Sequence, residues 1–248
     1  MNKLATCFYL ILLAFCFFAS PVFSQEQNLE QNNQANLDEP TAQPIEFNSA
    51  KFGVTLTFPT GWVVEPQEDK RAAKAEEVQG VYSRENLTDR TKGLLGQPLF
   101  PGGEEEQAID QLVGDLTNAS VSAVPIVSAY HNDPQQIEIA ERPHIYLRVK
   151  PISSNDPFAE ERSAWQLSVK FAKGTFVVPP NEFNHKGIDA IGTIYNYQSL
   201  SSGVEITQED YAFRHGQELL TLSLIAPSSE VESLRMDFDS VLDSLVLR

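Results

Sequence analysis

The sequence predicts an α+β fold in which helices pack against a mostly antiparallel sheet. Three observations predict it. Segments that alternate apolar and polar residues recur along the chain, the tight-turn pair His215-Gly216 separates two of them, and an amphipathic segment with helical spacing closes the chain. No internal repeat of about 20–50 residues is visible, and nothing indicates a doubly wound parallel sheet.

Residues 1–24 have the features of a cleavable signal peptide. Lys3 provides a positive start, an unbroken apolar run extends from Phe8 to Ala19, and Val22 and Ser24 stand where signal peptidase prefers small residues. The run is shorter than the about 20 apolar residues of a transmembrane helix, and Gln-, Asn- and Glu-rich sequence follows it. We therefore expect cleavage after Ser24 and a periplasmic or secreted protein.

Processing at this point would remove both cysteines. Neither Cys7 nor Cys16 follows the small residue that lipid attachment requires. The mature chain would then have no thiol, which excludes a disulfide, a catalytic cysteine and a thiolate metal site. Residues 25–44 are rich in Gln, Asn, Glu and Asp, a composition typical of an unstructured leader. We expect one α+β domain over residues 45–248.

The negative charge of the chain limits the classes of partner that it can bind. The sequence has 18 basic and 34 acidic side chains, and cleavage would remove only Lys3, leaving a net charge of −17 with histidine neutral. So acidic a surface repels nucleic acid and anionic lipid headgroups. We therefore expect no nucleic-acid partner and no stable membrane insertion after processing.

In the first part of the domain, alternating residues predict a strand over 54–58, a break at 59–61 and a second strand over 62–64. The charged, Ala-rich segment 67–78 indicates a short surface helix, and Val81-Tyr82 a further strand.

The middle of the chain predicts one helix and several strands. Acidic residues precede apolar residues at helical spacing, which predicts a helix over 104–117. Beyond it, the apolar pattern predicts strands over 121–130, 136–141, 144–152 and 165–171. Pro125 indicates an edge or a bulge in the first of these strands. The alternation is clearest in the segment that begins at Trp165.

The last part of the chain predicts three strands and a helix. Residues 155–162 are interpreted as a polar connection and 177–186, with Pro179-Pro180, as a loop. Strands are expected over 188–197, 204–213 and 218–225, the last stopped by Pro227. Ser229 and Glu232 fit a capping box before an amphipathic helix, whose apolar positions are Val231, Leu234, Phe238, Val241, Leu242 and Leu245.

Both ends of this domain resemble a known family. The strand 53–59 with the Pro-x-x-Trp element Pro59-Thr60-Gly61-Trp62, and the hairpin, strand and helix from His215 to Leu245, are similar to the ends of PsbP-like and Mog1-like domains. The resemblance implies an α-β-α sandwich around a central antiparallel sheet, in mainly non-catalytic proteins. It transfers no catalytic residue to a numbered position.

Histidines are the first candidates for site chemistry. His131, Asp133 and His144 form the only grouping that could gather around a metal, but their spacing matches no compact ligand pattern. We interpret them, together with His185 near Glu182, as surface or turn residues. No metal site is predicted.

Other catalytic signatures are absent. The Gly-x-Ser-x-Gly elbow does not occur, and Ser201-Ser202-Gly203 is interpreted as a loop. A glycine-rich phosphate loop is also missing, so no cofactor is expected. In so acidic a chain, Glu160-Glu161 and Glu209-Asp210 carry no specificity as acid/base pairs. The Asn86 and Asn118 triplets match the glycosylation pattern, for which chance is sufficient.

Two hypotheses about function remain. Trp62 and Trp165 could line a ligand groove, although their apolar strand contexts favour the core. We predict no catalytic residue and assign no ligand-binding residue. The favoured hypothesis is an exported, non-enzymatic binding or accessory protein of the cell envelope that recognises an envelope protein or a small ligand. The alternative is a periplasmic hydrolase that uses His131, His144 or His185.

Overall fold

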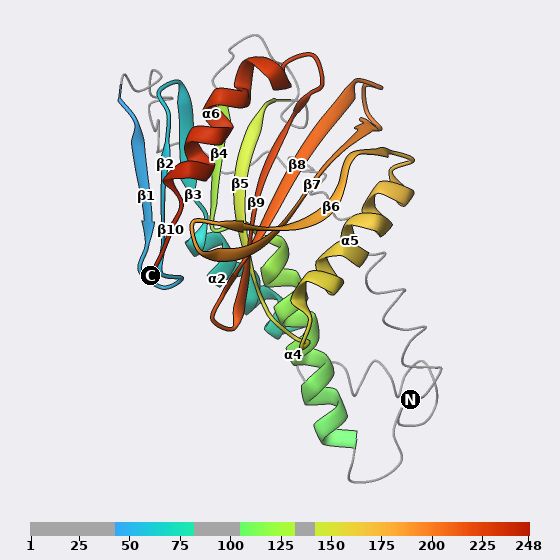
Figure 1. Ribbon diagram of the computed structural model, residues 1–248. Coiled ribbons are helices and arrows are strands. Elements are labelled where there is room, and N and C mark those ends of the chain that lie inside the picture. The colour runs from blue at the N-terminus through green and yellow to red at the C-terminus, as the bar shows by residue number, and fades with distance from the viewer. Residues whose placement is uncertain (1–42, 82–104, 132–141) are drawn as a thin grey trace, which may run out of the picture. The chain divides into compact units, whose positions relative to one another are not determined.

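The computed structural model describes residues 43–81, 105–131 and 142–248, and in these ranges it contains two antiparallel sheets and four helices (Figure 1). The small sheet has the order β1-β2-β10, with strands β1 (Ile45–Ser49), β2 (Val54–Phe58) and β10 (Val246–Leu247). The α+β class and the terminal helix predicted from the sequence are confirmed. The predicted signal peptide and nearly all of the leader lie outside the described residues.

The large sheet has the order β3-β4-β5-β9-β8-β7-β6. Its strands are β3 (Trp62–Pro66), β4 (Val127–His131), β5 (His144–Pro151), β6 (Thr175–His185), β7 (Ile188–Gln198), β8 (Glu205–His215) and β9 (Glu218–Pro227). The helices are α2 (Glu68–Val81), α4 (Glu105–Ala123), α5 (Pro157–Phe171) and α6 (Val231–Ser244). All strand pairs between described residues are antiparallel. The predicted hairpin at His215-Gly216 joins β8 to β9, as expected.

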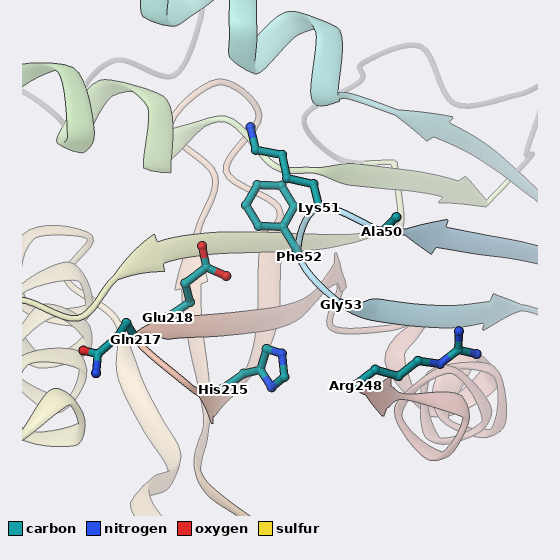
Figure 2. Close-up of a pocket in the computed structure, with 8 residues that line it drawn as sticks. All are labelled: Ala50, Lys51, Phe52, Gly53, His215, Gln217, Glu218 and Arg248. Carbon is teal, nitrogen blue, oxygen red and sulfur yellow. The ribbon is translucent and has the colours of Figure 1, made fainter.

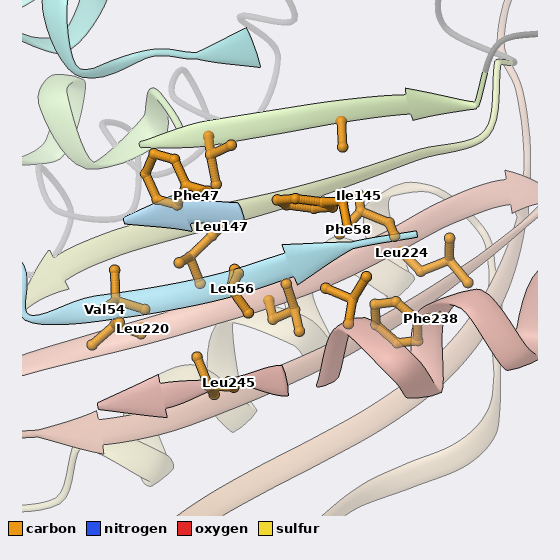
Figure 3. Close-up of a cluster of buried hydrophobic side chains, with 14 of the residues drawn as sticks. Phe47, Val54, Leu56, Phe58, Ile145, Leu147, Leu220, Leu224, Phe238 and Leu245 are labelled. Carbon is orange, nitrogen blue, oxygen red and sulfur yellow. The ribbon is translucent and has the colours of Figure 1, made fainter. Parts of the chain in front are cut away.

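The two faces of the large sheet contact different layers. On one face, Leu220 and Leu224 of β9 pack with Leu56 of β2 and Phe238 of α6 in the main core cluster (Figure 3). On the other face, Leu219 of β9 belongs to a smaller cluster with Trp165 of α5, Ile191 and Ala212. This division follows from the strand period of two, which points successive side chains to opposite faces.

The helix α6 forms because its apolar residues recur every three or four positions. Val231, Leu234, Phe238 and Val241 are its buried residues. The predicted capping box is wrong, since Glu230 is the N-cap and no side chain caps the helix. Beyond the helix the chain adds β10 to β2, a pairing that the sequence did not predict.

The predicted strand over 165–171 and the predicted polar connection over 155–162 are wrong, because both lie in helix α5. Asp156 caps this helix by accepting a hydrogen bond from the Ala159 N–H (3.0 Å), and Pro157 starts it. Glu161, Trp165 and Val169, spaced four apart, form its buried stripe. Over only seven residues, alternating residues also satisfy part of this helical stripe, so the period of two was misleading.

The predicted loop over 177–186 is wrong as well, because β6 runs through it as an edge strand. The register with β7 shifts between Phe176 and Val178 and again between Val178 and Asn181. These bulges accommodate Pro179 and Pro180, which lack the N–H that a regular ladder requires.

Three predicted boundaries also change. The predicted helix over 104–117 is observed as α4, which continues to Ala123, so the predicted strand over 121–130 begins only at Val127 and Pro125 lies in the connection. Val81 ends α2 and is not in a strand. Residues 82 and 136–141, both predicted as strand, lie outside the described residues.

Candidate functional site

The face of the large sheet that contacts α5 carries a group of polar and aromatic side chains where an apolar layer would be usual. We name this group the polar face. Along β5, His144, Tyr146 and Arg148 are half-buried and alternate with fully buried residues of the main core. The register places Tyr146 opposite Ser223, and Ser223 opposite Asp210, in one row across three strands. The polar face consists of Tyr130, His144, Tyr146, Arg148, Tyr195, Tyr197, Gln208, Asp210 and Ser223.

Asp210 is the centre of the polar face. Its side chain is buried, and both carboxylate oxygens accept a hydrogen bond from Gln208 Nε2 (3.0 Å each). The Tyr195 hydroxyl donates a further hydrogen bond to Oδ2 (3.1 Å). Gln208 also donates to the Tyr146 hydroxyl (3.3 Å), so that Tyr146 and Asp210 share one amide. These contacts fix the carboxylate in one orientation.

Arg148 and His144 hold the ring of Tyr146 from two sides along β5. The Arg148 guanidinium lies 4.6 Å from the centre of this ring, and Nη2 donates to the Tyr146 hydroxyl (2.8 Å). The His144 ring stacks on the ring of Tyr146 with centroids 5.9 Å apart. Tyr130 continues the row on β4, with its ring centroid 6.0 Å from that of His144. These contacts fix the orientation of the rings.

Burial shifts the pKa values of several groups on this face. Burial raises the pKa of Asp210, although the Gln208 hydrogen bonds and the charge of Arg148 lower it. Burial also raises the pKa of Tyr146, opposed by the charge of Arg148. It lowers the pKa of His144, opposed by the hydrogen bond between Nδ1 and the Arg142 carbonyl. Clusters of perturbed groups of this kind mark candidate functional sites.

One end of the polar face is closed by α5. Glu161 of this helix is buried and forms an ion pair with Lys150 of β5, and it accepts a hydrogen bond from the Thr221 hydroxyl (3.4 Å). This ion pair ties the helix to the sheet beside the polar network.

The histidines named from the sequence do not converge. Tyr130 pairs with His144, so the next residue, His131, points to the opposite face of the sheet. There it contacts the Trp62 ring, with centroids 5.4 Å apart. His185 packs on Phe213. Asp133 lies outside the described residues, and no group of three or more potential metal ligands occurs among the residues that are described.

The remaining candidates have structural surroundings. Trp62 is buried in the main core and its Nε1 donates to Asp237 Oδ2 (2.8 Å), and Trp165 is buried in the small cluster. Glu182 pairs with Arg162. Ser201-Ser202-Gly203 lies in the β7–β8 turn, Asn118 lies in α4, and Asn86 lies outside the described residues. Glu160 is linked to Ser153 and not to its neighbour Glu161. Glu209 bonds Arg235 on the core face, away from Asp210.

A shallow hollow lies elsewhere, between the β1–β2 turn, the β8–β9 turn and the end of the chain. It has a volume of about 480 Å³, and Lys51, Phe52, His215, Glu218 and Arg248 are among its lining residues (Figure 2). Gly53 shapes it, because the Gly53 carbonyl accepts a hydrogen bond from the Arg248 N–H (2.8 Å).

Gly53→Ala is expected to lower the free energy of unfolding by about 1–3 kcal/mol. The φ of Gly53 is +59°, and an added Cβ would lie 2.7 Å from the Arg248 carbonyl oxygen. Gly216→Ala is the matched control, since Gly216 has the same φ but no atom within 4 Å of an added Cβ. Urea unfolding compares the two, and equal losses would show that the close contact with Arg248 has no cost.

No described helix is long and apolar enough to cross a membrane. No family model matches the chain, and no curated protein matches it.

Among solved structures, the chain is similar to cyanobacterial PsbP (CyanoP) from Synechocystis sp. PCC 6803, with 12% identity over 89% of this chain and 99% of that one, and a TM-score of 0.47. LpqN, involved in cell envelope biogenesis of Mycobacterium tuberculosis, is similar at 15% identity over 48% of this chain and 71% of its own, with a TM-score of 0.37. PA94 from Pseudomonas aeruginosa also has 15% identity, over 46% of this chain and 78% of its own, and a TM-score of 0.37. The first of these structures is a PsbP protein, and PsbP-like domains are what the two ends of the sequence resemble.

Proposed function

We propose that the protein is an exported, non-enzymatic binding or accessory protein of the cell envelope, and that the polar face binds its partner or ligand. The observation that carries the proposal is the mutual fixation of Tyr146, Arg148, Gln208 and Asp210 by hydrogen bonds of 2.8–3.3 Å. A surface whose donors and acceptors are already ordered loses little conformational entropy when it binds.

The same contacts make Asp210 a poor general base. A general base needs a carboxylate or imidazole that can reach a substrate proton. Asp210 is 1% exposed and its oxygens are occupied by Gln208 and Tyr195. Tyr130, His144, Tyr146 and Tyr197 remain half-buried, so their edges are the part of this face that a partner can contact.

Further parts of the proposal concern processing and architecture. We propose cleavage after Ser24, a leader over residues 25–44 and a single domain over 45–248 located in the periplasm or outside the cell. Helix α5 on one face of the large sheet and α6 on the other support an arrangement as an α-β-α sandwich.

The test is site-specific photocrosslinking in cells that export the full chain. A benzophenone amino acid at Tyr130 should give a discrete adduct, and Asp210→Ala should reduce the yield several-fold because it releases Gln208 and Tyr195. The same probe at Met236, an 81% exposed residue of α6, is the control. Equal adducts at both positions, or an unchanged yield in Asp210→Ala, would count against the polar face as the binding surface.

A further inference from the structure

Arg148 is a half-buried cation of the polar face whose guanidinium has N–H groups to offer. Its Nη2 donates to the Tyr146 hydroxyl (2.8 Å), and no ion pair joins Arg148 to a residue within 43–81, 105–131 or 142–248. Nε and Nη1 make no hydrogen bond to these residues, and neither atom is among the buried atoms that lack a partner. The guanidinium therefore retains accessible donors.

The carboxylates near Arg148 have partners of their own. Asp210 and Glu161 are the acidic residues whose charge acts on Arg148. Asp210 accepts two hydrogen bonds from Gln208, and Glu161 is paired with Lys150. The two acidic and two basic side chains balance in formal charge. The surroundings of Arg148 therefore select an anion through the hydrogen bonds of the guanidinium more than through net charge.

Beside Arg148, the polar face continues as a row of rings that ends next to an exposed valine. The ring centroids of Tyr146 and His144 are 5.9 Å apart, and those of His144 and Tyr130 are 6.0 Å apart. Val63 of β3 is opposite Tyr130 in the register and is 37% exposed. A ligand that reaches from Arg148 along this row therefore needs an anionic group at one end and an aromatic or aliphatic group beside it.

We propose that the polar face recognises an acidic side chain of a protein partner, which the free N–H groups of Arg148 bind. A neighbouring aromatic or aliphatic side chain of the partner contacts the rings of His144 and Tyr130. This inference rests on the proposed function and names the chemistry of its partner. A guanidinium binds a carboxylate through paired, charge-assisted hydrogen bonds. Tyrosine and arginine are also enriched among the residues that dominate the binding energy of protein interfaces.

The position of the row favours a protein over a small molecule. Small molecules bind in concave sites that enclose most of their surface. The hollow of Figure 2 is lined by other residues, none of which belongs to the polar face. A protein surface can lie across several strands and contact Arg148 and Tyr130 at the same time.

Two capped dipeptides test this chemistry on the purified exported protein. Acetyl-Asp-Phe-amide has the carboxylate and the ring, and acetyl-Asn-Phe-amide has the same shape without the charge. Titration is followed by the backbone amide signals in NMR spectra. The Asp peptide should shift the signals of residues 144–148 and bind about ten-fold more tightly than the Asn peptide. Arg148→Gln should remove this preference, and Tyr146→Phe should reduce it several-fold because the guanidinium loses the hydroxyl that orients it.

Arg214→Gln is the matched control, since Arg214 is an exposed arginine of β8 outside the polar face. It should leave both affinities within about two-fold of those of the unsubstituted protein. Thermal melting shows whether each variant is folded. If Arg148→Gln does not fold, Arg148→Lys, which keeps the charge but not the planar fork, should weaken the Asp peptide several-fold. No binding, equal binding of the two peptides, or equal losses in the Arg148 and Arg214 variants would overturn the proposal.

Crosslinking at Tyr130 separates a failure of this inference from a failure of the proposed function. Arg148→Gln should lower the yield of the protein adduct about ten-fold. An adduct that persists in Arg148→Gln overturns the inference and leaves the polar face as the binding surface. An adduct of small-molecule size overturns the protein partner and identifies a small ligand. Absence of any adduct in the unsubstituted protein contradicts the proposed function itself, and the inference with it.

Discussion

Replacement of Phe238 by alanine is expected to lower the free energy of unfolding by about 3–5 kcal/mol. Phe238 lies at the centre of the buried face of α6, is fully buried, and contacts Tyr211 with ring centroids 5.8 Å apart. The substitution would remove the ring from the layer between α6, the small sheet and the large sheet (Figure 3). For a domain of about 200 residues, a loss of this size lowers Tm by roughly 10 °C.

Met236→Ala is the control, because Met236 lies two residues earlier on the same helix and is 81% exposed. It should change stability by less than about 0.5 kcal/mol. Urea unfolding at 25 °C measures both variants, and the m-value shows whether the denatured state has changed. A loss of less than about 1 kcal/mol for Phe238→Ala would mean that α6 does not contribute a core layer.

The elements that local pattern determines were predicted well. Strands β2, β5, β7, β8 and β9 lie where the sequence predicts strands, over 54–58, 144–152, 188–197, 204–213 and 218–225. Helix α6 contains five of the six apolar positions predicted for it, and Leu245 follows the helix as its C-cap. In β5 and α6 the buried face is the face that the sequence marks, whereas β8 and β9 are buried on both faces.

The sequence did not predict α5 and β6 correctly, because the local pattern of each segment also fits another structure. Around Trp165, the helical stripe includes Glu161, a charged residue that is buried only because Lys150 and Thr221 of the sheet meet it. Strand β6 contains two prolines and becomes a strand only because β7 lies beside it with two bulges in the register. Both outcomes depend on contacts between distant parts of the chain, which a local pattern does not contain.

The polar face could be predicted only in part. The period of two in the predicted strand over 144–152 puts Tyr146 and Arg148 on one side, and that arrangement is observed. Gln208 and Asp210 belong to a run of four polar residues, 207–210, inside a predicted strand. This was a usable signal, since a charge in a buried strand needs a partner. Their connection to Tyr146 depends on β9 lying between β5 and β8, an order that the sequence does not state.

Removal of Arg235 is expected to cost about 3–5 kcal/mol at pH 7, because it leaves a buried carboxylate without its partner. Glu209 is fully buried on the core face of β8, and Arg235 Nη1 lies 2.5 Å from each of its oxygens. Arg235→Met keeps the apolar stem of the side chain and removes the charge. Arg162→Met is the control, since the Arg162 and Glu182 side chains are 37% and 58% exposed and their ion pair should contribute less than about 1 kcal/mol.

The dependence on pH identifies the cause of this loss. Burial raises the pKa of Glu209 above the usual value of a glutamate side chain, although the hydrogen bond and charge of Arg235 lower it. A raised folded-state pKa means that the native state binds the proton more tightly. The contribution of Glu209 to the free energy of unfolding is therefore greatest below its pKa in the unfolded chain. This contribution falls as pH rises through its pKa in the folded protein. Arg235→Met removes the lowering contribution, so its deficit should be small near pH 4 and grow toward pH 7.

A second substitution separates the buried charge from the lost contacts of the arginine. In Arg235→Met/Glu209→Gln no carboxylate is buried, so most of the loss at pH 7 should be recovered and its dependence on pH should disappear. Urea unfolding of the single and double variants between pH 4 and pH 8 completes the cycle. The deficit of Arg235→Met could instead be the same at every pH, and Glu209→Gln could restore nothing. The loss of stability would then come from the lost packing contacts of the Arg235 side chain. The ion pair would then contribute little to holding this helix on the sheet.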